Sequence, residues 1–97
     1  MPTASQPRQR VIDDSELHKI ARDTMQAHFR RLRERGKTKA ATPEQLYGFR
    51  AEDVIEMHFR QHGTGAGVWY RLKDGRVIDA LGKPAERERS WYVTAAH

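Results

Sequence analysis

Apolar and weakly polar residues recur at three- and four-residue steps from Leu17 to Leu32, and this periodicity constrains the fold more than any other feature. The positions on this face are Leu17, Ile20, Ala21, Thr24, Met25, His28, Phe29 and Leu32. Such spacing places side chains on one side of an α-helix, which must then pack against another element. Asp13 with Glu16 three residues later is typical of a helix start, and Gly36 is typical of a helix end. The pattern therefore predicts an amphipathic helix of about five turns.

Two further helices are expected in the middle of the chain. Thr42 followed by Pro43 is typical of an N-cap and first helical position, and Gly48 interrupts the short helix that follows. A third helix is predicted from about Ala51 to His62, because its apolar residues again have helical spacing. These residues are Ala51, Val54, Ile55, His58 and Phe59.

The C-terminal third of the chain has the signals of a β-hairpin. Asp74-Gly75 separates two runs, 68–72 and 77–81, that are rich in β-branched and aromatic residues. With Asp74-Gly75 as a two-residue turn, the expected cross-strand pairs are Leu72 with Val77, Tyr70 with Asp79 and Val68 with Leu81. Residues 91–94 predict a third antiparallel strand.

The predicted fold class is α+β: a long N-terminal helix, a short helix and a third helix, followed by an antiparallel β-hairpin and a third strand. Residues 1–10 are expected to be a disordered basic tail, and residues 11–97 a single small α+β domain. The order of elements allows a winged-helix-like topology. A recognition helix starting at Ala51 would, however, present Glu52, Asp53 and Glu56 to a polyanion, which opposes that use.

A dense block of cations lies at the end of the first predicted helix and in the segment after it. Between Arg30 and Lys39 six of ten residues are cationic, against the single acid Glu34. The cations are Arg30, Arg31, Arg33, Arg35, Lys37 and Lys39. Compensation of the helix dipole accounts for one or two of them, and the rest repel one another unless an anion, most commonly nucleic-acid phosphate, lies nearby. We therefore predict a small basic accessory or regulatory protein that binds DNA or RNA through this arginine-rich helix end, with Arg71 and Arg76 as secondary contacts.

The alternative is a protein-binding adaptor or inhibitor, for example one encoded by a phage or another mobile element to act on host machinery. The dipeptide Trp-Tyr occurs at Trp69-Tyr70 and again at Trp91-Tyr92, and in a strand each pair sends one ring to each face. Trp69, Ile78 and Trp91 would then form an aromatic sheet face of the kind that binds proteins, including a nucleic-acid-bound host protein. A homodimer that buries this face is a third alternative.

Other classes of function find little support in the sequence. The chain has no Cys, and none of its serines lies in a nucleophile-elbow motif, so we expect no enzyme activity and no catalytic residue. We also expect no cofactor and no metal, because His58 and His62 have helical spacing but no placed third ligand. No apolar run approaches the roughly 20 residues of a membrane span, so a cytoplasmic protein without a membrane partner is expected.

Overall fold

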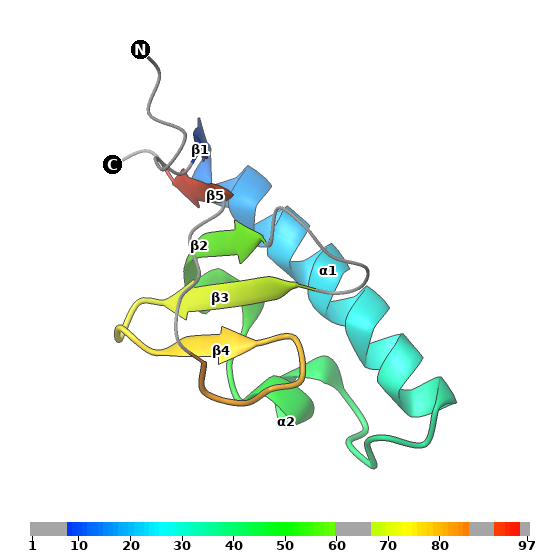
Figure 1. The fold of residues 1–97 in the computed structure, drawn as a ribbon. Helices are drawn as coiled ribbons and strands as arrows, with labels where there is room; N and C mark the ends of the chain where they lie inside the picture. Colours follow the sequence, from blue (N-terminus) through cyan, green and yellow to red (C-terminus); the bar gives the residue numbers. More distant parts are fainter. Residues whose placement is uncertain (1–7, 60–66, 86–90, 96–97) are drawn as a thin grey trace.

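The sheet of the protein joins strands from opposite ends of the chain. The computed structural model describes residues 8–59, 67–85 and 91–95. Its strands are β1 (Arg8–Ile12), β2 (Val54–Phe59), β3 (Val68–Leu72), β4 (Val77–Asp79) and β5 (Trp91–Ala95), and its helices are α1 (Asp14–Glu34), α2 (Pro43–Tyr47) and the single 3-10 turn η1 (Ala51–Asp53). The five strands form one mixed sheet in the order β1-β5-β2-β3-β4 (Figure 1). Only β1 and β5 are parallel; the other neighbours are antiparallel.

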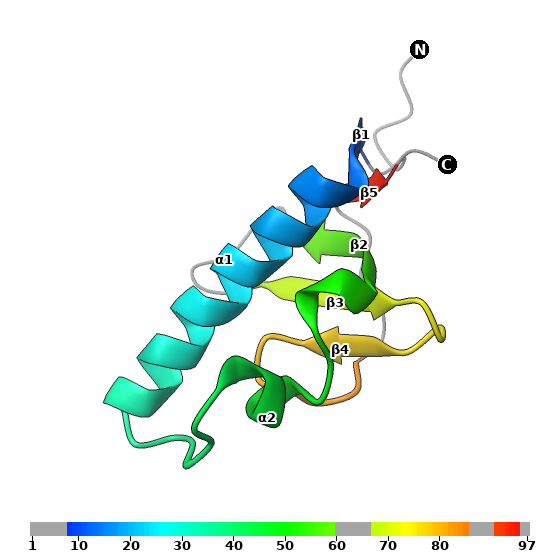
Figure 2. The ribbon, with the colours of Figure 1, turned by 180° about the vertical axis from the view of Figure 1, so that it is seen from behind.

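Helix α1 lies across one face of this sheet, behind the strands in Figure 1 and in front of them in Figure 2. Its buried residues follow one another at four-residue steps: Leu17, Ala21, Met25 and Phe29. Leu17, Ala21 and Met25 share a core cluster with Met57 of β2 and Tyr70 of β3. The predicted amphipathic helix is therefore confirmed, and burial of its apolar face against the sheet is the main reason for its stability.

The end of α1 is a Schellman motif centred on Gly36. The N–H of Gly36 donates to the carbonyl of Arg33 at 3.0 Å, and the N–H of Lys37 donates to the carbonyl of Leu32 at 2.7 Å. These two bonds satisfy carbonyls that the last helical turn leaves open. Gly36 has φ +67°, a conformation that glycine adopts without the steric penalty of a Cβ atom. The predicted stop at Gly36 is confirmed.

The predicted third helix is wrong. Residues 51–53 form only the turn η1, and residues 54–59 form β2, the central strand that pairs with both β3 and β5. Met57 and His58, which are adjacent and therefore point to opposite faces, are both fully buried. A strand buried on both faces does not alternate in polarity, so its apolar residues also fit helical spacing. The winged-helix-like topology is wrong for the same reason, because the element proposed as its recognition helix is a strand.

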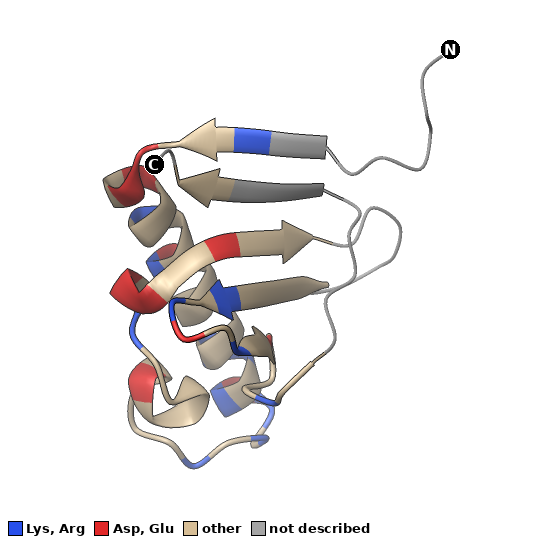
Figure 3. Ribbon diagram, turned by 90° about the vertical axis from the view of Figure 1, so that its left-hand side faces the viewer, with Lys and Arg blue, Asp and Glu red and all other residues tan. Residues whose placement is uncertain are grey.

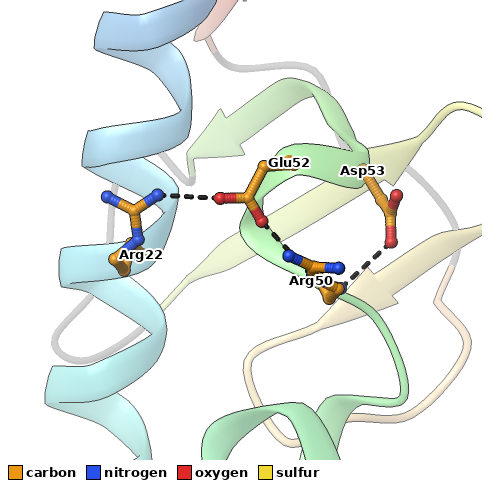
Figure 4. Close-up of polar contacts among 4 residues, drawn as sticks. All are labelled: Arg22, Arg50, Glu52 and Asp53. Atoms are coloured by element: carbon orange, nitrogen blue, oxygen red, sulfur yellow. Dashed lines mark hydrogen bonds and ion pairs between the residues drawn. The ribbon is translucent and has the colours of Figure 1, made fainter.

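Two of the acids that opposed a recognition helix, Glu52 and Asp53, instead stabilise the turn η1, which precedes β2. Glu52 accepts a hydrogen bond from the guanidinium of Arg22 in α1 at 2.8 Å and lies 3.6 Å from Arg50 (Figure 4). Asp53 accepts a hydrogen bond from the backbone N–H of Arg50 at 3.1 Å. The pKa of Glu52 is held below its ordinary value, first by its own backbone N–H and then by Arg22. These contacts connect η1 to α1 where the chain enters the sheet.

The predicted hairpin is confirmed, but its register is wrong by one residue. The observed pairs are Arg71 with Val77, Tyr70 with Ile78 and Trp69 with Asp79. The N–H of Leu72 donates to the carbonyl of Arg76 at 2.9 Å, so the loop has three residues rather than two. Gly75 takes φ +92° in this loop, as the third residue of such a turn often does. A one-residue shift exchanges the faces of a strand, and it places Ile78 in the core.

Both outer regions of the sheet differ from the prediction. Residues 91–95 form a strand as expected, but β5 lies between β1 and β2 rather than beside the hairpin. Strand β1 begins at Arg8, so the last three residues of the expected tail pair with β5; residues 1–7 lie outside the described residues. A short, charged edge strand of this kind has no apolar alternation by which the sequence could indicate it.

Three aromatic rings pack between α2 and the sheet. Tyr47, Phe49 and Tyr70 have ring centroids 5.5 to 5.9 Å apart. The hydroxyl of Tyr47 donates to the carbonyl of Ala80 at 2.8 Å, whereas the buried hydroxyl of Tyr70 has no hydrogen-bond partner among the described residues. Burial, with a smaller contribution from Asp79, raises the pKa of Tyr47 to about 12. Burial also raises the pKa of Tyr70, so both hydroxyls stay neutral. The two tyrosines therefore form a matched pair, one bonded and one not.

Replacing each tyrosine by phenylalanine should affect stability differently. Tyr47→Phe leaves the buried carbonyl of Ala80 without its donor and should lower the free energy of unfolding by about 1 to 3 kcal/mol. Tyr70→Phe removes a buried hydroxyl that gains no hydrogen bond, and should leave stability unchanged or raise it by up to about 1 kcal/mol. Chemical denaturation of both variants measures the difference. Equal destabilisation by the two changes would contradict this account of the aromatic cluster.

Candidate nucleic-acid interface

The six predicted cations lie at the end of α1 and along the segment that follows it. Arg30, Arg31 and Arg33 belong to the helix and Arg35 is its C-cap, while Lys37 is the last residue of the Schellman motif and Lys39 follows it. All six side chains are exposed. In Figure 3 the last part of α1 and the segment after it carry blue, and red marks the start of α1 and η1, while both colours also occur on other elements. We call Arg30, Arg31, Arg33, Arg35, Lys37 and Lys39 the cationic helix end.

The arginines of the cationic helix end point in two directions. Residues three or four apart lie on the same side of a helix, so Arg30 and Arg33 form one pair and Arg31 and Arg35 form another. Arg30 and Arg33 lie on the side of α1 that faces α2. A contact that uses all four arginines must therefore wrap around the helix end rather than lie along one face.

None of these six cations forms an ion pair with a carboxylate of the described residues, including Glu34 within the same segment. The other arginines whose side chains the structure describes each lie within 4.0 Å of an acid. They are Arg10 with Glu16, Arg22 and Arg50 with Glu52, Arg71 with Glu56, and Arg76 with Asp74. Among the arginines whose side chains are described, the unpaired guanidinium groups are thus all found at the end of α1.

A groove of about 520 Å³ runs beside this end of α1, between the helix and the start of α2. Its lining residues are Gln26, Phe29, Arg30, Arg33, Glu34 and Pro43. The guanidinium carbon of Arg33 lies 5.8 Å from the centroid of the Phe29 ring, within the range of a cation–π contact. Below we call this site the α1/α2 groove. It combines an apolar lining with two cations, one carboxylate and one amide.

The α1/α2 groove was not predicted from the sequence. Gln26, Phe29 and Glu34 read only as parts of an amphipathic helix, and Pro43 only as a helix start. No local sequence pattern indicates that α2 lies beside α1, because the position of α2 depends on the path of residues 35–42. The proximity of an aromatic residue and a cation at positions 29 and 33 was the one signal present in the sequence.

The two hairpin arginines lie apart from the cationic helix end. Arg71 is 3.6 Å from Glu56, and the Nε of Arg76 donates to Asp74 at 2.7 Å. The hairpin turn and the end of α1 lie on opposite sides of the molecule in Figure 1. The structure therefore does not unite Arg71 and Arg76 with the six other predicted site residues.

The alternative aromatic surface is not assembled by the residues proposed for it. Trp69 is 9% exposed and Ile78 is 4% exposed. They lie on opposite faces of the sheet, because Ile78 pairs with Tyr70, the neighbour of Trp69. The side chain of Trp91 lies outside the described residues. Trp69 and Ile78 therefore offer no common exposed face to a partner.

Comparisons of the chain with protein-family models, with curated proteins and with solved structures gave no match. Neither described helix has the length and apolar content to cross a bilayer. Within the described ranges, no three His, Asp or Glu side chains gather as a metal site would require.

His28 lies beside the cationic helix end, one turn before Arg31. Its pKa is lowered below the ordinary value of 6.5, first by burial and second by repulsion from Arg31. Its Nδ1 atom is buried and has no hydrogen-bond partner among the described residues. The folded protein therefore resists protonation of His28 more than the unfolded chain does.

This difference should make stability fall on acidification. Below about pH 6.5 the unfolded chain binds a proton that the folded protein does not, so the free energy of unfolding decreases until the pH passes below the folded pKa. His28→Gln removes the titrating group. The loss of stability between about pH 7.5 and about pH 5.5, measured by chemical denaturation, should be smaller in His28→Gln than in the original protein. An equal loss in the two proteins would exclude this role for His28.

Proposed function

We propose that the protein binds nucleic acid through the cationic helix end and acts as a small accessory or regulatory protein. The observation that carries the proposal is the distribution of ion pairs. Among arginines with described side chains, every one elsewhere in the fold has a carboxylate within 4.0 Å, and Arg30, Arg31, Arg33 and Arg35 have none. These four, with Lys37 and Lys39, leave a concentrated positive charge that phosphate would relieve.

Helix stability alone does not account for this charge. A cation in the last helical turn gains roughly 0.3 to 1 kcal/mol from the helix dipole, and the effect fades beyond that turn. Lys37 and Lys39 lie beyond the end of α1, where they gain nothing comparable. Cations crowded within about one Debye length, roughly 8 Å at physiological salt, instead repel one another. The excess is better explained by an external anion than by the fold.

The geometry favours a polymeric anion over a single small one. The two arginine pairs point to different sides of α1, so one small anion could not contact both. A phosphate backbone carries charge at regular intervals and can follow the helix end from one pair to the other. Arginine also contacts phosphate in a bidentate way, which lysine does not. The surface is therefore suited to a nucleic-acid strand.

The proposal predicts a steep dependence of binding on salt. Each contacted phosphate contributes about 0.7 to 0.9 to the slope of log K against log salt concentration. Removing Arg31 and Arg35 together, as R31A/R35A, should weaken binding of a labelled oligonucleotide and reduce this slope by up to about 1.4 to 1.8. Fluorescence anisotropy titrations at several salt concentrations give the slope.

The matched control removes the same number of charges from the hairpin. R71A/R76A should leave the slope unchanged, because both arginines are already paired with carboxylates of the protein. Circular dichroism and thermal melting establish that both double variants remain folded. Binding that is insensitive to salt, or equal losses in the two double variants, would refute the proposal.

A further inference from the structure

The α1/α2 groove has features that a phosphate-binding surface does not need. Phe29 and Pro43 line it with apolar surface, which gains nothing from a hydrated phosphate. Its volume of about 520 Å³ lies within the range of sites that take small organic groups. Arg30 and Arg33, both part of the cationic helix end, also line it. The groove is therefore continuous with the proposed phosphate contacts but chemically different from them.

Glu34 decides which part of a nucleotide fits this groove. A carboxylate among the lining residues repels a phosphate placed inside, whereas it accepts hydrogen bonds from the amino groups of bases. Gln26 adds an amide that both donates and accepts. The cation Arg30 suits a phosphate outside the groove. This mixture of groups matches a nucleotide with its base inside the groove and its phosphate outside.

Arg33 provides a planar group for a base to stack on. Its guanidinium carbon lies 5.8 Å from the centroid of the Phe29 ring, so the aromatic ring restrains the guanidinium beside the groove. Bases stack on guanidinium planes and on aromatic rings without requiring a particular sequence. In a duplex the faces of the bases are covered by their neighbours. Only an unpaired base can reach such a site.

We infer that the α1/α2 groove receives an unpaired base, and that the ligand of the cationic helix end is therefore single-stranded nucleic acid. The inference rests on the proposed function. Arg30 contacts the backbone phosphate of the same nucleotide, while Arg33 stacks on its base. Arg31 and Arg35, on the other side of α1, contact neighbouring phosphates and do not distinguish single strands from duplexes.

Three probes of about 12 nucleotides test this inference: a mixed-sequence single strand, the same strand with abasic residues, and the matching duplex. The abasic strand keeps its phosphates but has no bases. We expect the intact strand to bind about tenfold or more tightly than the abasic strand, which corresponds to one stacking contact. It should also bind more tightly than the duplex.

Variants separate the base contact from the phosphate contacts. R33K keeps the charge but loses the planar group, so it should reduce the intact-to-abasic ratio towards one and leave binding of the abasic strand unchanged. R31A/R35A should weaken binding of both strands equally and leave the ratio as it was. The two effects are distinguishable even if R33K is slightly less stable, because each ratio is measured within one variant.

The outcomes separate the inference from the proposed function. Equal affinity for intact and abasic strands, or tighter binding of the duplex, overturns the inference while salt-dependent binding continues to support the proposed function. A ratio that R31A/R35A reduces as much as R33K also overturns it, because the base contact would then lie outside the groove. If no probe binds with a dependence on salt, the proposed function fails and the inference fails with it.

Discussion

The buried apolar face of α1 ends before the helix does. The exposed cationic helix end exists because of this difference in length. The stripe that begins at Leu17 ends at Phe29, while α1 continues to Glu34. Within α1, Leu32 is the one partly buried residue after Phe29, and the others are exposed. The last turn therefore lies beyond the core and can carry charge without disturbing it. Because this turn is helical and closed by Gly36, the backbone that carries its arginines is fixed by hydrogen bonds.

The same residue type serves two purposes in this fold. Arg22 bonds Glu52 and so connects α1 to the turn that precedes β2, the strand at the centre of the sheet. Two turns further along the same helix, Arg30 has no acid to bond among the described residues. One helix thus carries a structural arginine where the chain returns to it, and further along it arginines with no carboxylate of the described residues within 4.0 Å.

What the sequence predicted well was local. Helix α1 has a long periodic face and a clear stop at Gly36, and the turn at Gly75 has a strong hairpin signal. What it predicted badly depended on neighbours distant in the chain. The apolar residues of 54–59 fit helical and strand spacing equally. Only the pairing of this segment with β3 and β5 determines that it is a strand. The positions of the six cations were evident in advance, but their lack of ion pairs and the groove beside α2 were not.

The parallel pairing of β1 with β5 has a consequence for how the polypeptide becomes folded. Among the described strands β1 contacts only β5, and β5 is also what separates β1 from β2. Strand β1 must therefore wait for β5, which is synthesised later, and until residues 91–95 are available the edges of β1 and β2 that flank β5 stay open. Contacts between such distant segments form slowly. We therefore expect closure of the sheet to be a late step of folding, with strand edges open to association until it occurs.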